Sequence, residues 1–114
     1  MKSASAILIC DRDSLFREAL LNFLLAAGYA RVEVVATARE AIRKLQSQSY
    51  KYVMIGISRP WSRARRLAAI AQRRQPGAKI FLLIHVEDMP LIKNQSFDYV
   101  IKEYAFANLL EAMT

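Results

Sequence analysis

The sequence predicts an α/β fold in which one five-stranded parallel sheet is covered by helices on both faces. Five short apolar runs, at 6–10, 32–35, 52–57, 80–85 and 99–102, alternate with segments of helical periodicity. Three of the runs are almost continuously apolar, which is typical of strands buried on both faces. Strands that alternate with helices through right-handed crossovers give a doubly wound sheet. At 114 residues, the chain fits one domain.

The first helix is expected between the first two apolar runs. Its apolar residues recur at the spacing of one helix face, namely Phe16, Leu20, Phe23, Leu24 and Ala27. Asp13 or Ser14 can cap its start, and Gly28 can end it.

Cap signals also mark the second and third helices. Thr37 and Glu40 have the T-x-x-E form of a capping box, and an apolar helix face follows them. Ser62 is expected to cap the third helix, which Pro76 and Gly77 stop.

The segment between the last two apolar runs, "VEDMPLIKNQSFD", is a poor helix candidate because Pro90 and Asn94 interrupt it. The fourth helix is therefore expected to be short or missing. The final helix is clearer, since one face carries Phe106, Leu109, Leu110 and Met113.

Composition limits the class of protein. Hydrophobic residues make up 54% of the chain and charged residues 24%, which is typical of a globular domain. The lone cysteine, Cys10, excludes an internal disulfide. The apolar run at 6–10 is too short for a signal peptide or a membrane span. These observations predict a soluble cytoplasmic protein without membrane contact.

The net charge of +7 is unevenly distributed. A basic cluster without any acid runs through the third helical segment and comprises Arg59, Arg63, Arg65, Arg66, Arg73, Arg74 and Lys79. Two interpretations are open. The cluster is a patch for nucleic acid or another anionic partner, or it is simply the solvated face of a helix.

In doubly wound sheets the functional site lies beyond the carboxyl ends of the strands. The residues at those ends are Cys10 to Asp13 after the first run, Gly56 in the third, Ile84 and His85 in the fourth, and Lys102 in the fifth. The residue that the third strand contributes to this edge is thus Gly56, which has no side chain.

These segments resemble the receiver domain of two-component response regulators over almost the whole chain. "ILICDRDSLFREAL" is similar to the first strand, acidic turn and first helix of that family, and "YKYVMIGISRP" to its third strand and loop. "RRQPGAKIFLLI" resembles the turn into strand four, and "FDYVIKEYAFANLLEAM" resembles strand five with its lysine. The resemblance implies a flavodoxin-like sheet with strand order 2-1-3-4-5.

The resemblance also implies a phosphorylation pocket, in which this chain departs from the family. Gly56 stands at the phosphoacceptor position and Arg12 at that of the second metal-binding acid. Ile84 replaces the hydroxyl residue of strand four. Asp11 and Lys102 are kept, while Glu103 replaces the proline that usually follows the lysine. We expect a pseudo-receiver that has no catalytic residue, metal or cofactor. Asp13 is a weaker candidate for the lost metal ligand.

Two interpretations of Arg12 are open. Its guanidinium pairs with Asp11 or Asp13 and fills the metal cavity, or it points into solvent. Lys102 could bond to Asp11 as well.

The family signals through the face formed by helix four, strand five and helix five. The resemblance places Tyr99, Ile101, Glu103 and Tyr104 on this signalling face, with Tyr99 at the aromatic position that rotates on switching. A short fourth helix would expose Met89, Leu91 or Ile92, unless these side chains pack onto the sheet.

The sequence therefore predicts a non-enzymatic, phosphorylation-independent signalling module that contacts a protein partner or a second copy of itself, in signal transduction or transcription regulation. It is expected to stand alone or to be the N-terminal part of a longer regulator. The alternative is a basic nucleic-acid-binding α/β domain that uses the Arg63–Arg74 helix. A phosphatase-like role for Cys10 is disfavoured, because Asp11 and Asp13 would repel phosphate.

Overall fold

The computed structural model describes residues 5–57, 61–92 and 97–113, and its central element is a parallel sheet. The strands occur in the order β2-β1-β3-β4-β5, as expected. Their bounds are Ala6–Cys10 (β1), Arg31–Val35 (β2), Tyr52–Gly56 (β3), Lys79–Ile84 (β4) and Asp98–Ile101 (β5). The strands that end on Gly56, Ile84 and Ile101 each end one residue earlier than predicted, and β4 and β5 also begin one residue earlier. In β5 the reason for the earlier end is a 3₁₀ turn, Lys102–Tyr104, that begins at the next residue.

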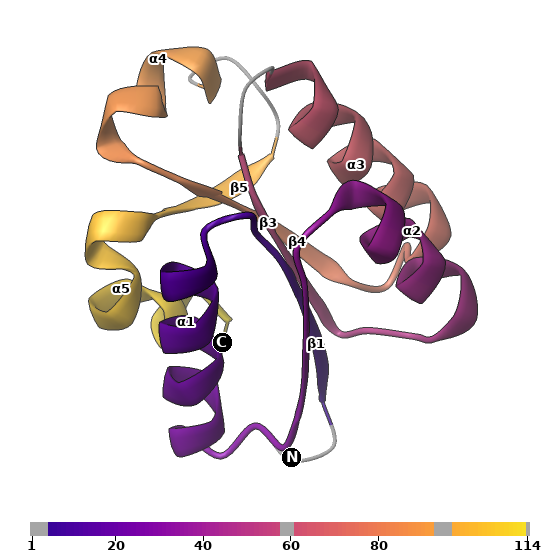
Figure 1. Cartoon of the computed structure of the whole chain (residues 1–114), viewed down its shortest axis with the longest axis horizontal. Helices are drawn as coiled ribbons and strands as arrows, with labels where there is room; N and C mark the ends of the chain where they lie inside the picture. Colours follow the sequence, from indigo (N-terminus) through magenta and orange to yellow (C-terminus); the bar gives the residue numbers. More distant parts are fainter. Residues whose placement is uncertain (1–4, 58–60, 93–96, 114) are drawn as a thin grey trace.

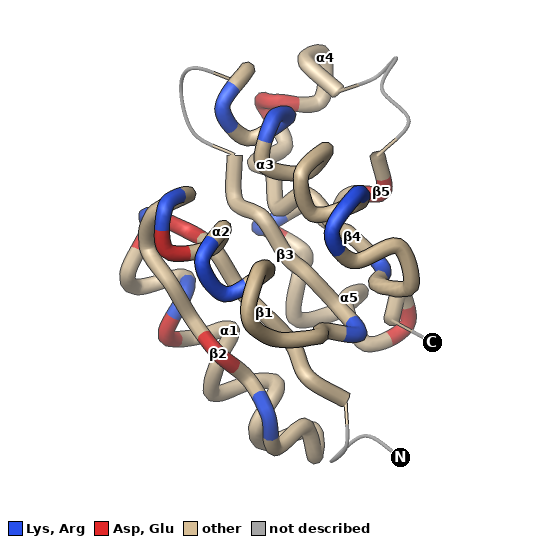
Figure 2. The backbone as a smooth tube through the Cα atoms, turned by 90° about the vertical axis from the view of Figure 1, so that its right-hand side faces the viewer, with Lys and Arg blue, Asp and Glu red and all other residues tan. Residues whose placement is uncertain are grey.

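Helices cover both faces of the sheet (Figure 1). Their bounds are Ser14–Ala26 (α1), Ala38–Ser47 (α2), Trp61–Arg74 (α3), Met89–Ile92 (α4) and Ala105–Met113 (α5). α2 and α3 pack on one face, and α1 and α5 pack on the other. Figure 2 looks onto the side of the molecule that carries α2 and α3, and basic residues are visible on both helices.

Alternation along each strand divides the core into two clusters. In β1, Leu8 faces the cluster under α2 and α3, whereas Ile7 and Ile9 face the cluster under α1 and α5. All three side chains are fully buried. Burying a Leu or Ile side chain stabilises the fold by about 1.5–3 kcal/mol, so this two-sided burial explains the continuous apolar runs.

The cap predictions are confirmed for two helices. Asp13 caps α1 by accepting a hydrogen bond from the Phe16 N–H, at 3.1 Å. Thr37 caps α2 by accepting from the Glu40 N–H, at 3.2 Å. Gly28 follows the C-cap of α1 and has a φ of 102°, a left-handed conformation that favours glycine.

The predicted cap of the third helix is wrong. α3 already begins at Trp61, so Ser62 lies inside its first turn. The preceding residues, including Arg59 and Pro60, lie outside the described residues.

The fourth helix is short, as expected. A 3₁₀ turn, Val86–Asp88, leads into α4, which spans only Met89–Ile92. Ile92 is buried and Met89 packs against the core, so Leu91 is the exposed member of the three predicted residues.

Gln75, which directly follows α3, joins three segments with a buried side-chain amide. Its oxygen accepts from the Tyr50 N–H at 3.0 Å. Its nitrogen donates to the carbonyl oxygens of Leu45 at 3.0 Å and Gln48 at 2.7 Å. The amide therefore fixes the end of α3 to the end of α2 and to the start of β3.

Candidate functional site: the carboxyl edge of the sheet

The carboxyl ends of four adjacent strands bring the predicted pocket residues together. Asp11 follows β1 and Gly56 ends β3. Ile84 ends β4 and Lys102 follows β5. Parallel pairing places β1 beside β3, β3 beside β4, and β4 beside β5. The edge therefore collects residues that are far apart in the sequence.

A buried ion pair lies at the centre of this edge. The Lys102 Nζ is 2.7 Å from Asp11 Oδ2, and the two side chains are 5% and 4% exposed. Each of the two buried charges therefore has an opposite charge as its direct neighbour. The Lys102 Nζ also lies 4.7 Å from the centroid of the Phe16 ring, a cation–π distance.

Backbone contacts hold Asp11 in this position. Its Oδ1 accepts from the Asp13 N–H at 2.9 Å. The Arg17 Nη1 donates to the Asp11 carbonyl oxygen at 2.6 Å. The Asp13 N–H and the Lys102 ammonium therefore hold the carboxylate, while Arg17 of α1 holds the main chain of Asp11.

Gly56 lies against this carboxylate. A Cβ atom built on Gly56 would overlap Asp11, since Cγ and both carboxylate oxygens would be closer than 3.0 Å. The Asp11 carboxylate thus fills the space that a side chain at position 56 would need. Ile84 is fully buried at the same edge.

Arg12 and Asp13 are exposed. Asp13 is engaged as the cap of α1. Within the described part of the chain, Arg12 forms no ion pair with Asp11 or Asp13. It lines a small cavity of about 80 Å³, together with Gly56 and Arg63. The cation that pairs with Asp11 is Lys102.

The residues at this edge do not fit the metal site that the resemblance implies, taken as a site for Mg²⁺. Divalent magnesium prefers several oxygen ligands in octahedral geometry. Here the Asp11 carboxylate already contacts an ammonium group, and a guanidinium follows in the sequence. Among the residues that the structure describes, no group of three or more His, Cys, Asp or Glu side chains could hold a metal ion.

Cys10 is a poor nucleophile. It is 6% exposed, and burial raises its pKa to about 12, with further contributions from the charges of Asp11 and Glu40. Its Sγ contacts the Thr37 carbonyl oxygen at 3.6 Å. A thiol with this pKa stays protonated at neutral pH, whereas the thiolate is the reactive species.

One contact that the sequence does not predict joins His85 and Glu103. His85 Nδ1 lies 3.0 Å from Glu103 Oε2, and the Val86 N–H donates to Glu103 Oε1 at 3.1 Å. A hydrogen bond from the backbone lowers the pKa of Glu103, and the bond with His85 lowers it further. The only signal in the sequence is that these residues follow β4 and β5, which are neighbours.

Replacing Glu103 by Gln is expected to make the stability of the protein less dependent on acid pH. Because the folded-state pKa of Glu103 lies below its ordinary value of 4.5, the carboxylate stabilises the folded state above that pH. This stabilisation is lost as the pH falls through the lowered pKa. The E103Q variant should therefore melt earlier than the wild type at neutral pH, and the difference should narrow below pH 4.5. Thermal melts at several pH values, with E87Q as the control, test this. A difference in melting temperature between the wild type and E103Q that stays constant at all pH values would contradict this prediction.

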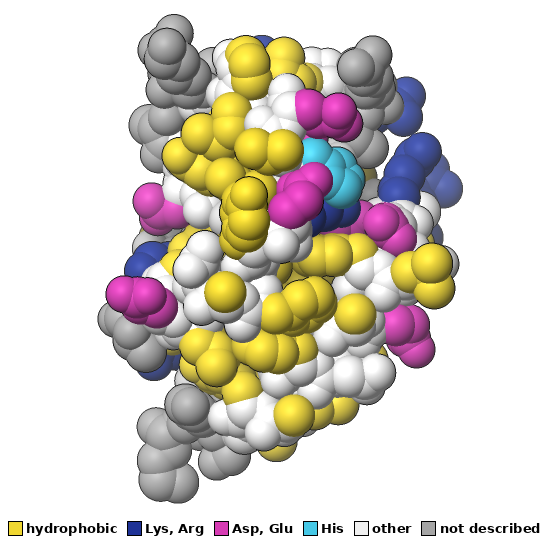
Figure 3. Space-filling view, turned by 90° about the vertical axis from the view of Figure 1, so that its left-hand side faces the viewer, with side chains coloured by type: hydrophobic (Ala, Val, Ile, Leu, Met, Phe, Trp, Pro, Cys, Tyr) yellow, Lys and Arg dark blue, Asp and Glu magenta, His cyan; other side chains and the backbone are white. Residues whose placement is uncertain are grey.

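The predicted signalling-face residues lie at the β5 side of the molecule. Tyr99 and Tyr104 are 42% and 55% exposed, Glu103 is exposed, and Ile101 is half-buried. Figure 3 faces the side of the molecule that carries α1, α4 and α5, and it shows hydrophobic side chains gathered there. The large hydrophobic residues that are exposed in the described part of the chain are Leu15, Leu25, Val86, Leu91, Tyr99, Tyr104 and Phe106. None of them comes from α2 or α3.

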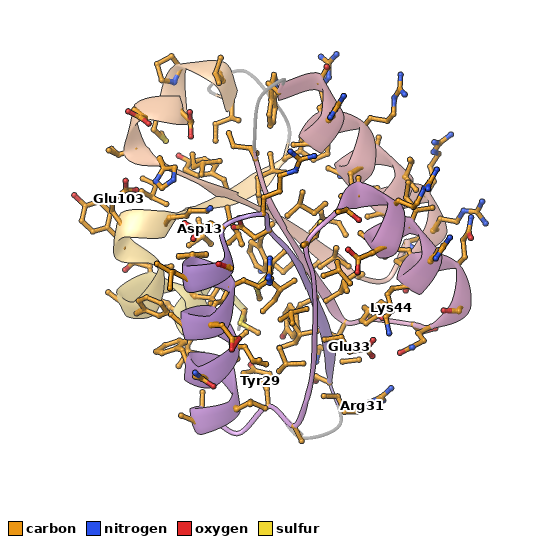
Figure 4. The ribbon with its side chains drawn as sticks, in the orientation of Figure 1. Asp13, Tyr29, Arg31, Glu33, Lys44 and Glu103 are labelled. Carbon is orange, nitrogen blue, oxygen red and sulfur yellow. The ribbon has the colours of Figure 1, made fainter. Side chains whose placement is uncertain are left out.

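The basic cluster occupies a different part of the surface. Five of its arginines lie on α3 and are exposed, namely Arg63, Arg65, Arg66, Arg73 and Arg74. They belong to a different element from the signalling-face residues, which lie in β5 and in the turn that follows it. Figure 4 shows nitrogen-tipped side chains that project from α2 and α3 away from the sheet.

Solved structures of receiver domains have the same fold. TrrA, a response regulator from Thermotoga maritima in complex with Mg²⁺-BeF, is 26% identical, with 95% of each chain covered and a TM-score of 0.80. A CheY-like receiver domain protein from Methanospirillum hungatei is also 26% identical, with 96% of this chain and 90% of that chain covered and a TM-score of 0.79. The NtrC4 receiver domain from Aquifex aeolicus has a TM-score of 0.75 at 16% identity, over 96% and 93% of the two chains.

Comparisons with sequences give no further identification, because no protein-family model and no curated protein matches the chain. The structural neighbours support a receiver-like signalling domain and do not favour the nucleic-acid-binding alternative. In the described residues, no helix combines the length and the apolar character that crossing a bilayer requires.

Proposed function

We propose that the chain is a phosphorylation-independent receiver-like module that acts by protein–protein contact in signal transduction or transcription control. The observation that supports this proposal is the position of Asp11. Its carboxylate fills the space beside Gly56 and is neutralised by Lys102. A phosphoryl group has neither an acceptor nor room at that place.

The chemistry of phosphoryl transfer supports the same proposal. Transfer needs a nucleophile, together with cations and hydrogen-bond donors that stabilise the phosphoryl oxygens. Gly56 offers no nucleophile and Ile84 no hydroxyl. Lys102 is already engaged by Asp11. We therefore propose that the domain is not an enzyme and works without a metal or cofactor. Separately, we propose that it acts in the cytoplasm.

We further propose that the signalling face binds the partner, which is another protein or a second copy of the chain. Exposed apolar side chains that gather on one side of a domain often mark an interaction surface. Tyr99 and Tyr104 supply large aromatic groups of the kind that is enriched at interfaces. Because phosphorylation is absent from this scheme, the partner must supply the free energy for any conformational change.

Incubation with a small phosphodonor and Mg²⁺, followed by intact mass spectrometry, tests the proposal. We expect no gain in mass. A receiver domain that retains the acceptor aspartate, treated in parallel, serves as the positive control. A gain of one phosphoryl group, mapped to an aspartate of this chain, would refute the proposal.

Addition of Mg²⁺ alone is expected to leave the protein unchanged. A receiver with paired acids gains stability when a divalent cation neutralises them. Here Lys102 already supplies that charge to Asp11. Neither the melting temperature nor the backbone amide NMR shifts of Asp11, Arg12 and Gly56 should move at millimolar Mg²⁺. A saturable shift of these amides would contradict this expectation.

A further inference from the structure

The whole excess of positive charge lies on two neighbouring helices. The chain contains 17 basic and 10 acidic residues. α2 and α3 together carry eight of the basic residues and only one acid, Glu40, so that nine residues of each sign remain elsewhere. The rest of the molecule is electrically balanced, and the α2–α3 layer accounts for the net charge of +7.

Helical spacing arranges these charges along the line where α2 and α3 meet. On α3, residues three or four apart form one stripe, which comprises Arg63, Arg66, Ile70, Arg73 and Arg74. On α2, a matching stripe contains Arg39, Ile42 and Arg43. Ile42 and Ile70 are half-buried, and they line a pocket of about 360 Å³ with Arg73 and Arg74. We call this surface the α2–α3 seam.

The arginines of the seam are available for an external partner. Arg39, Arg43, Arg63, Arg66, Arg73 and Arg74 are all exposed. Within the described ranges, none of these six guanidinium groups forms an ion pair. Lys44, by contrast, lies on another face of α2 and is paired with Glu33 of β2 at 2.9 Å. Figure 4 shows these two side chains next to each other.

Charge and shape together identify the kind of partner. Unpaired arginines attract carboxylates, and their repulsion is relieved when an acidic surface covers them. The aliphatic pocket between them suits an apolar side chain, whereas a phosphate backbone has no group to fill it. We propose that the α2–α3 seam docks an acidic segment of a partner protein, with an apolar side chain over Ile42 and Ile70 and carboxylates against the flanking arginines.

This inference goes beyond the proposed function, because the α2–α3 seam shares no residue with the signalling face, which lies in β5 and the turn after it. It requires neither the loss of phosphorylation nor a partner at Tyr99 and Tyr104. The two surfaces can therefore fail or succeed independently in experiments.

A synthetic peptide probes the seam directly. The probe is a fluorescein-labelled peptide in which a leucine pair is flanked by runs of glutamate. Its control has serines in place of the leucines. We expect saturable binding in fluorescence anisotropy, with the serine peptide weaker by about fivefold because burial of apolar side chains is lost.

Arg66 and Arg65 offer a matched pair of variants. Both are exposed arginines on α3, but only Arg66 belongs to the stripe of the seam. R66E is expected to weaken binding of the leucine peptide by about tenfold, and R65E by less than about twofold. I70S should weaken the leucine peptide to the level of the serine peptide.

Three results would overturn the inference. Equal losses in R65E and R66E would indicate diffuse charge attraction. Tighter binding of a duplex DNA oligonucleotide than of the leucine peptide would make the surface a nucleic-acid interface. Absence of saturable peptide binding at low salt would show that the seam is not a docking site.

Discussion

Replacing Gly56 by alanine is expected to destabilise the protein by about 2–4 kcal/mol, because the new methyl group must displace a paired, buried carboxylate. The added Cβ would overlap the Asp11 carboxyl group. Asp11 cannot move freely, since it is held by the Lys102 ammonium and the Asp13 N–H. Urea unfolding monitored by circular dichroism measures the loss.

A second glycine provides the control for this prediction. A Cβ at Gly77 would meet no atom within 4 Å, so G77A should change stability by less than about 0.5 kcal/mol. In a double-mutant cycle, G56A should cost much less when Asp11 is already alanine. Equal effects of G56A and G77A would mean that the carboxylate does not fill the space beside Gly56. G56D is expected to be at least as destabilising as G56A and not to restore phosphorylation, because Arg12 and Ile84 remain.

Replacing Lys102 by methionine is expected to have a similarly large effect, a loss of about 3–5 kcal/mol. The substitution keeps the apolar stem but removes the ammonium that neutralises Asp11. The carboxylate would then be a buried charge without a counter-ion. Chemical denaturation at neutral pH measures this loss.

Two control variants distinguish the loss of charge from the loss of packing as the cause of the instability of K102M. K51M removes an exposed lysine and should be nearly neutral, within about 0.5 kcal/mol. The double variant D11N/K102M removes both charges and should recover much of the stability that K102M loses. If the double variant is as unstable as K102M alone, the ion pair is not the reason for the loss.

Much of the fold could be predicted because its signals are local. The apolar runs are continuous where strands are buried on both faces, as in Ile7, Leu8 and Ile9. Asp13 and Thr37 indicate where their helices begin, because their side chains cap the first turn of the same helix. The Ser62 prediction failed because a serine near a helix start has the same sequence signal whether it lies at the cap or one residue inside the helix.

The sequence predicts where the candidate site lies, but it does not predict which side chains of the site contact each other. The order of the strands brings Asp11, Gly56, Ile84 and Lys102 to one edge. Whether Arg12 or Lys102 pairs with Asp11 depends on side-chain directions, which periodicity does not encode. The contact between His85 and Glu103 likewise depends on the adjacency of β4 and β5, because the two residues are 18 positions apart.

The amide of Gln75 has a consequence for recognition at the α2–α3 seam. Because it bonds to the end of α2 from the residue after α3, the two basic helices cannot slide or splay apart without breaking buried hydrogen bonds. A partner segment that binds at the α2–α3 seam would therefore contact two helices that are already fixed relative to each other. Binding would cost little conformational entropy of the protein, because these helices are already ordered. Little of the electrostatic attraction between the arginines and the carboxylates would then be offset by an ordering cost, so most of it would contribute to the binding free energy.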